Sequence, residues 1–152
     1  MSGRGGGWVV AQFALIVLVM AAVVIPPDWP SGARGILSVV GAVIAVVGAA
    51  VAVLSARALG GALTPFPRPV EGGELVESGP YAVVRHPVYS GGILFFGGWS
   101  LYAGPVALVL TAVLAVLWAG KTAVEERHLS AAYPAYAGYA ARVRWRLVPG
   151  LY

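Results

Sequence analysis

The polar side chains that could take part in chemistry fall into two short stretches of an otherwise apolar chain. The first stretch contains Glu71, Glu74, Glu77, Tyr81, Arg85, His86 and Tyr89. The second stretch contains Lys121, Glu125, Glu126, Arg127 and His128. Two apolar segments lie between them, and a hairpin made from these segments starts and ends on the same side. We therefore expect the two polar groups to meet in space.

The first stretch ends in a turn that is suited to an anion. Pro87 is typical of the first turn of a helix, so we expect a helix to begin there. Arg85 and His86 would then lie beside the free N–H groups of that turn, which favour a carboxylate or phosphate. The alternative is that both side chains only anchor the chain to lipid headgroups at the membrane interface.

The second stretch places ionisable groups directly after an apolar run, a position that favours a functional role. Lys121 and Glu125 are four residues apart and share a helix face, so a simple intrahelical ion pair is the alternative. Glu125 and Glu126 point in different directions, which allows one of them to face a pocket. The chain has no cysteine, and its two histidines lack close ligand spacing, so we expect no metal site.

Composition sets the environment of these groups. The chain has 152 residues, which predicts one domain, and 59% of them are hydrophobic whereas only 11% are charged. Soluble domains usually carry about 25% charged residues. Too few polar side chains are present to coat a water-facing surface, so a bilayer must surround much of the chain.

Four apolar segments predict an all-α integral membrane fold with about four transmembrane helices. They cover residues 8–25, 35–59, 88–102 and 106–119, and the last two are short for a bilayer that needs roughly 20 residues. Gly41, Gly48 and neighbouring alanines of the second segment predict close packing between helices. Residues 121–142 have apolar side chains at helical spacing, which predicts an amphipathic C-terminal helix interrupted near Pro134.

The distribution of cations predicts the orientation. With four spans, both termini lie on one side, together with nine of the ten lysines and arginines; only Arg34 lies on the other. The positive-inside rule then predicts a multi-pass protein of a cell membrane, a bacterial inner membrane, with the termini and the active site cytoplasmic. Because the cations flank apolar spans, we expect membrane lipids as partners and no nucleic acid.

One stretch carries a family resemblance. Residues 74–91 resemble the isoprenylcysteine carboxyl methyltransferase family and its bacterial relatives, the phospholipid methyltransferase-like membrane enzymes, through L-V-x-S-G-x-Y followed by R-H-P-x-Y-x-G. The order continues with Glu125-Glu126-x-x-Leu129, then Tyr136 and Tyr139, and a late proline, Pro149. The resemblance covers about residues 60 to 150. It implies one membrane methyltransferase domain over 1–152, with two N-terminal spans in 1–59 and a cofactor-binding catalytic part in 60–152.

The resemblance also implies a cofactor, S-adenosylmethionine, with S-adenosylhomocysteine as the product. The positions that match cofactor contacts are Glu74, Leu75, Val76, Tyr81, His86, Pro87, Val88, Tyr89 and Glu125. Lys121 falls where eukaryotic members carry a substrate-facing arginine, so Arg85 or Lys121 is expected to orient the acceptor. Glu126 is the candidate for removing a proton from an amine or phenol acceptor. The acceptor is expected to be lipophilic, either lipid-like or resembling an isoprenylcysteine carboxylate.

Two other hypotheses remain at this point. A membrane reductase of the sterol-reductase type, using NADPH, has a similar C-terminal layout but a much longer chain. A small non-enzymatic membrane transporter fits the size, but it needs an ionisable residue inside an early span, and residues 8–54 offer none there.

Overall fold

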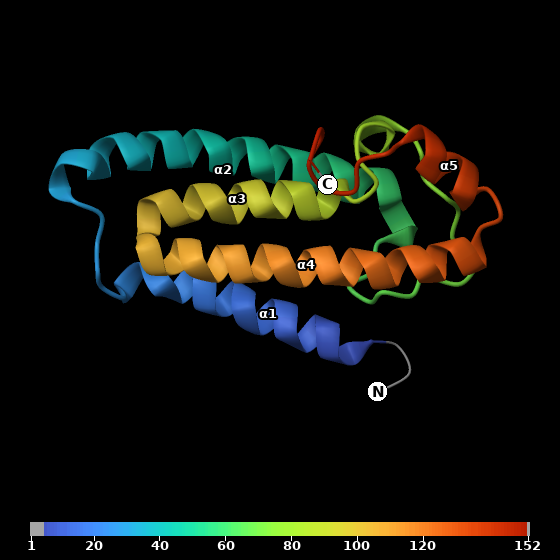
Figure 1. Cartoon of the computed structure of the whole chain (residues 1–152), viewed down its shortest axis with the longest axis horizontal. Helices are drawn as coiled ribbons and strands as arrows, with labels where there is room; N and C mark the ends of the chain where they lie inside the picture. The colour runs from blue at the N-terminus through green and yellow to red at the C-terminus, as the bar shows by residue number, and fades with distance from the viewer. Residues whose placement is uncertain (1–4, 152) are drawn as a thin grey trace.

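The computed structural model describes residues 5–151, which form helices joined by loops and contain no strand. Four long helices run side by side along one axis (Figure 1): α1 Gly6–Ala21, α2 Ser31–Leu59, α3 Pro87–Ala103 and α4 Pro105–Ala132. A short helix, α5 Tyr136–Arg142, follows α4, and short 3-10 turns occupy η2 Ala22–Val24, η3 Gly60–Ala62 and η4 Gly79–Ala82. The all-α fold predicted from the sequence is confirmed.

The helices are not arranged in chain order. Figure 1 shows α3 between α2 and α4, with α1 on the far side of α4. The two N-terminal helices therefore flank opposite sides of the α3–α4 hairpin. A core cluster of Val19 on α1, Phe96 on α3, and Leu114 and Trp118 on α4 joins three of the four helices.

The contact between α2 and α3 depends on small residues. A Cβ atom added to Gly48 of α2 would lie 2.3 Å from the backbone nitrogen of Phe95, and one added to Gly98 of α3 would lie 2.4 Å from the carbonyl oxygen of Gly41. The two backbones thus touch, which confirms the close packing predicted from the second apolar segment. This seam fixes α3 and hence the position of its first turn.

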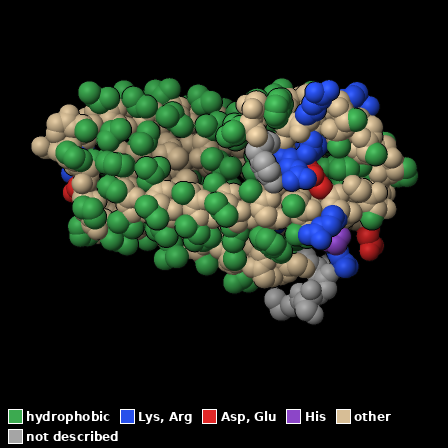
Figure 2. All heavy atoms as spheres, in the orientation of Figure 1, with side chains coloured by type: hydrophobic (Ala, Val, Ile, Leu, Met, Phe, Trp, Pro, Cys, Tyr) green, Lys and Arg blue, Asp and Glu red, His purple; other side chains and the backbone are tan. Residues whose placement is uncertain are grey.

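The outer surface matches a membrane environment. Three segments are long and apolar enough to cross a membrane: Gly6–Val24, Ser31–Ala62 and Pro105–Ala132. The fourth long helix, α3, has 17 residues, which corresponds to about 25 Å of rise. Charged side chains gather at one end of the molecule (Figure 2), and Asp28 and Arg34 form an ion pair at the start of α2. Arg4 lies outside the described residues.

The amphipathic helix predicted after residue 119 is continuous with the last apolar segment. Helix α4 runs from Pro105 to Ala132 without a break, and the partners of its polar side chains are described below. The expected interruption at Pro134 is confirmed, since a proline has no N–H to continue the helix, and α5 begins two residues later.

Candidate functional site

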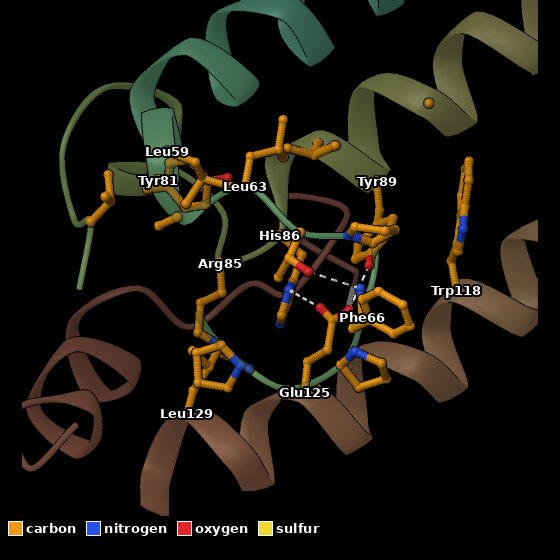
Figure 3. A pocket seen from close by; sticks show the side chains of 18 of the residues that line it. Leu59, Leu63, Phe66, Tyr81, Arg85, His86, Tyr89, Trp118, Glu125 and Leu129 are labelled. Atoms are coloured by element: carbon orange, nitrogen blue, oxygen red, sulfur yellow. Dashed lines mark hydrogen bonds and ion pairs between the residues drawn. The ribbon is translucent and has the colours of Figure 1, made fainter. Parts of the chain in front are cut away.

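The α3–α4 hairpin brings the two polar stretches together at the loop end of the bundle. The Tyr89 hydroxyl donates to Glu125 Oε1 at 2.6 Å, and His86 Nδ1 lies 3.4 Å from Glu125 Oε2 (Figure 3). Arg85 Nε donates to Glu126 Oε1 at 2.7 Å. The predicted meeting of the two groups is confirmed, and helix α3 begins at Pro87 as expected.

A cavity of about 590 Å³ opens beside this cluster. Its volume lies within the range of roughly 300–1,000 Å³ that is usual for ligand pockets. The polar end of the cavity is formed by Arg85, His86, Tyr89 and Glu125, and Figure 3 shows these side chains converging. The remaining wall is mostly apolar and aromatic, with contributions from α1, α2, the proline-rich loop, α3, α4 and α5, among them Phe13, Ala52, Phe66, Val88, Phe95, Phe96, Trp118 and Leu129.

Most of the site residues suggested by the sequence line this cavity. They are Glu74, Leu75, Val76, Tyr81, Arg85, His86, Val88, Tyr89 and Glu125. Three others lie behind its wall. Pro87 is fully buried in the first turn of α3, and Lys121 and Glu126 are in contact with lining residues rather than with the cavity itself.

Lys121 is completely buried and holds three parts of the chain together. Its Nζ donates to Gln12 Oε1 on α1 and to the carbonyl oxygen of Pro65 in the loop, each at 2.7 Å. It also lies 3.8 Å from Glu125 Oε1, so the intrahelical pair is present as one of several contacts. These partners explain how a lysine is accommodated on an otherwise apolar helix.

Arg85 fastens the C-terminal segment to the start of α3. Its Nη1 donates to the carbonyl oxygens of Val143 and Arg144 at 2.7 and 2.8 Å, while its Nε holds Glu126. The backbone N–H of Arg85 donates to the carbonyl of Trp145, and the backbone N–H of His86 donates to the carbonyl of Arg146. Residues 143–147 therefore form a strap across the polar end of the site.

His86 lies between two carboxylates and is only 7% exposed. Burial of the ring lowers the pKa of His86, but the adjacent Glu125 and Glu126 carboxylates outweigh it, and the net shift is upward from the usual value. The ring Nε2 is 3.4 Å from Glu126 Oε1, an ion-pair distance, yet it makes no hydrogen bond of acceptable geometry. His86 thus presents a buried, unsatisfied nitrogen beside the cavity.

Three tyrosines complete the wall on the loop and α5 side. Burial raises the pKa of Tyr139 to about 12, and it also raises the pKa values of Tyr81 and Tyr136, so all three phenols stay protonated at neutral pH. The Tyr139 hydroxyl donates to the carbonyl of Tyr81 at 2.8 Å. The Tyr136 hydroxyl is buried without a hydrogen-bond partner among the described residues.

Buried polar atoms are normally hydrogen-bonded, so His86 Nε2 and the Tyr136 hydroxyl indicate a ligand that would complete them. Both residues line the cavity, together with the acceptor groups of Glu74 and Glu125. The cavity therefore offers donors and acceptors at one end and aromatic walls at the other, which suits a polar ligand next to an apolar one. Within residues 5–151, no group of three His, Asp or Glu side chains is placed to hold a metal ion.

Sequence reasoning placed Glu74, Leu75 and Val76 of the proline-rich loop at the cofactor, but it missed the contribution of α1. Gln12 and Phe13 of α1 line the cavity, as do the loop residues 63–69. One signal was present, because Gln12 is a lone amide in the apolar run 8–25. Residues 63–69 have no distinctive spacing that would have singled them out.

Comparison with known proteins decides the family. The model of the family described as phospholipid methyltransferase matches residues 36–136, which run from α2 to the start of α5 and include both polar stretches. The chain belongs to the phospholipid methyltransferase family. Both polar stretches thus lie in the part of the chain that this family shares.

A curated relative is the cobalt-zinc-cadmium resistance protein CzcN of Cupriavidus metallidurans. It is 42% identical over 72 residues, which are 45% of this chain and 32% of the relative. The chain thus spans about a third of the length of that relative. Helix α1, with Gln12, and the strap 143–147 lie outside the family match.

Proposed function

We propose that this protein transfers a methyl group from S-adenosylmethionine to a lipophilic acceptor that enters from the bilayer. The observation that carries the proposal is one cavity whose polar end holds the His86–Glu125–Tyr89 cluster and whose other walls include apolar side chains of the long helices. Family membership supplies the methyl transfer, and the chemistry of the polar end supports the choice of cofactor. The concentration of cations at this end supports a cytoplasmic position for the site.

The residues present fit the cofactor. S-adenosylmethionine has a carboxylate, an ammonium and two ribose hydroxyls, and it supplies a methyl group on a positively charged sulfur. His86 Nε2 and the Tyr136 hydroxyl make no hydrogen bond among the described residues, so they are suited to donate to the carboxylate or the ribose. Glu125 and Glu74 are suited to accept from the ammonium or the hydroxyls, and Leu75, Val76, Tyr81, Val88 and Tyr89 supply the surrounding walls.

The acceptor is proposed to occupy the apolar part of the cavity. Phe13 of α1 and Leu63 of the loop line the cavity and are 52% and 48% exposed, so the cavity reaches the apolar outer surface. An in-line displacement at a methyl carbon depends on alignment and on the exclusion of water more than on a strong acid or base. Arg85 lines the polar end of the cavity, and Lys121 and Glu126 position Glu125, Arg85 and His86 from behind the wall.

Loss of the Glu125 carboxylate tests the cofactor site. In Glu125→Ala, S-adenosylhomocysteine should bind at least about tenfold more weakly, because a charged hydrogen-bond acceptor is removed from a buried site. Isothermal titration calorimetry on the purified full chain measures this, with Glu71→Ala as the control, since that glutamate is exposed and does not line the cavity. Unchanged affinity in Glu125→Ala would remove this residue from the site. Binding of NADPH without binding of S-adenosylmethionine would instead favour a membrane reductase.

A further inference from the structure

Building on the methyl transfer inferred above, we propose that Gln12 determines specificity by donating a hydrogen bond from its side-chain amide to an oxygen atom of the acceptor. The acceptor is then an amphiphile whose headgroup carries a carboxylate, carbonyl or phosphate oxygen. Gln12 lies on α1, outside the family match, and lines the cavity while being only 7% exposed.

The orientation of the Gln12 amide follows from its neighbours. Oε1 accepts from Lys121 Nζ at 2.7 Å and from Trp118 Nε1 at 3.4 Å. An ammonium and an indole N–H can only donate, so the oxygen of the amide must face them. The amide NH2 group is thereby turned away from Lys121 and Trp118.

The amide nitrogen is left without a partner. Within the described residues Gln12 Nε2 makes no hydrogen bond, and it is not among the fully enclosed polar atoms, so it is accessible at the cavity wall. Phe13, the next residue of α1, and Trp118, whose indole N–H donates to Gln12, are apolar lining residues of the same cavity. A donor in such surroundings is poorly satisfied until a ligand supplies an acceptor atom, and that requirement gives selectivity.

The charge behind Gln12 favours an oxygen that carries negative charge. Lys121 polarises the amide through the bond to Oε1, and its own ammonium is fully buried with only the single Glu125 carboxylate near it. An amide that donates to an anion while accepting from an ammonium links the two charges. Gln12 also contacts both Trp118, which belongs to the apolar wall, and Lys121, which lies near Glu125. An amphiphile would therefore have the junction of its headgroup and its chain at Gln12.

Two substitutions separate the proposed role from a structural one. Gln12→Glu keeps an oxygen for Lys121 and Trp118 but removes the N–H donor, and Gln12→Met keeps the length while removing both functions. The probes are dodecanoate and dodecylammonium, which share a chain length and differ in the headgroup. Binding to the full chain in maltoside micelles is followed by tryptophan fluorescence, and S-adenosylhomocysteine affinity is measured on the same samples by calorimetry.

We expect the wild-type protein to prefer dodecanoate. Both variants should bind dodecanoate at least about tenfold more weakly, because each loses a hydrogen bond to a charged group. Dodecylammonium affinity should rise in Gln12→Glu and stay unchanged in Gln12→Met, while S-adenosylhomocysteine affinity stays at the wild-type value in Gln12→Glu. Wild-type dodecanoate affinity in Gln12→Glu, no dodecanoate binding to the wild type, or a loss of S-adenosylhomocysteine binding in that variant would each overturn the proposal. Failure of the wild-type protein to bind S-adenosylhomocysteine is a different result, and it would overturn the proposed methyl transfer.

Discussion

The first turn of α3 and the middle of the same helix are held by different forces. The first turn, from His86 to Ser90, is enclosed by carboxylates, a guanidinium and the carbonyl groups of the C-terminal strap. The stretch from Gly91 to Gly98 packs backbone to backbone against α2, through glycines. The first region uses directional bonds that can be exchanged for bonds to a ligand, whereas the second depends on shape.

This difference separates stability from recognition. Without a hydrophobic driving force between helices in a bilayer, close van der Waals packing is what keeps α2 on α3. The charged end adds less to that packing, but it carries the unsatisfied atoms of His86 and Tyr136 that a ligand would complete. Substitutions in the seam should therefore affect folding, and substitutions at the charged end should affect local order and binding.

The largest effect is expected in the seam. In Gly48→Ala the new Cβ would lie 2.3 Å from the Phe95 nitrogen and 2.7 Å from the Gly91 carbonyl oxygen, backbone atoms that move only if the helices separate. We expect a loss of about 3 kcal/mol or more in the free energy of unfolding, at the upper end of overpacking effects. Thermal unfolding in detergent measures it.

The matched control lies on the other partner of the seam. Gly97 of α3 has nothing within 4 Å of an added Cβ, so Gly97→Ala should unfold at the wild-type temperature or slightly above it. Equal destabilisation by the two substitutions would show that the loss in Gly48→Ala does not come from the α2–α3 contact, because replacing glycine by alanine within a helix by itself favours folding.

A smaller effect is expected at the charged end. Arg85→Met removes the bonds to Glu126 and to the strap, but Glu126 keeps Arg146 at 2.8 Å and His86 at 3.4 Å. We therefore expect about 2 kcal/mol, less than for a buried charge left fully unpaired. Residues 143–147 should also become accessible, which faster tryptic cleavage after Arg144 would reveal.

The exposed ion pair of the same protein provides the comparison for Arg85. Arg34 and Asp28 are 3.4 Å apart and both side chains are 58% exposed. Arg34→Met should change the free energy of unfolding by less than about 1 kcal/mol, the usual range for surface pairs. A protected strap in Arg85→Met would contradict the assignment of that arginine as its fastening point.

The helices and the hairpin were predictable because they follow from features that sequence displays directly. Runs of apolar residues marked all four long helices, and Pro87 marked the start of α3. The topology of a hairpin then brought Arg85, His86 and Tyr89 to Glu125 and Glu126 with no further information. Local periodicity and chain geometry were sufficient for these parts.

The remaining parts depend on contacts that residue types do not reveal. The strap 143–147 binds mainly through its backbone carbonyls, and its two arginines in the sequence indicate only a basic tail. The buried Lys121 donates to Gln12 and to the carbonyl oxygen of Pro65, which lie far away in the chain. Only the packed structure brings such partners together.

The smallest expected effect is a pH dependence at the first turn of α3. His86 has a pKa raised above 6.5 by Glu125 and Glu126 despite burial, so the folded protein binds its proton more tightly than the unfolded chain does. The resulting stabilisation is complete below about pH 6.5 and is lost as pH rises through the raised pKa. Thermal unfolding temperatures measured between about pH 6 and about pH 9, where few other side chains titrate, should fall gradually for the wild type and stay level for His86→Gln. Parallel profiles for the two proteins would show that the carboxylates do not hold His86 in its charged form. The first turn of α3 would then differ from the α2–α3 glycine contact in its geometry but not in a dependence of its stability on pH.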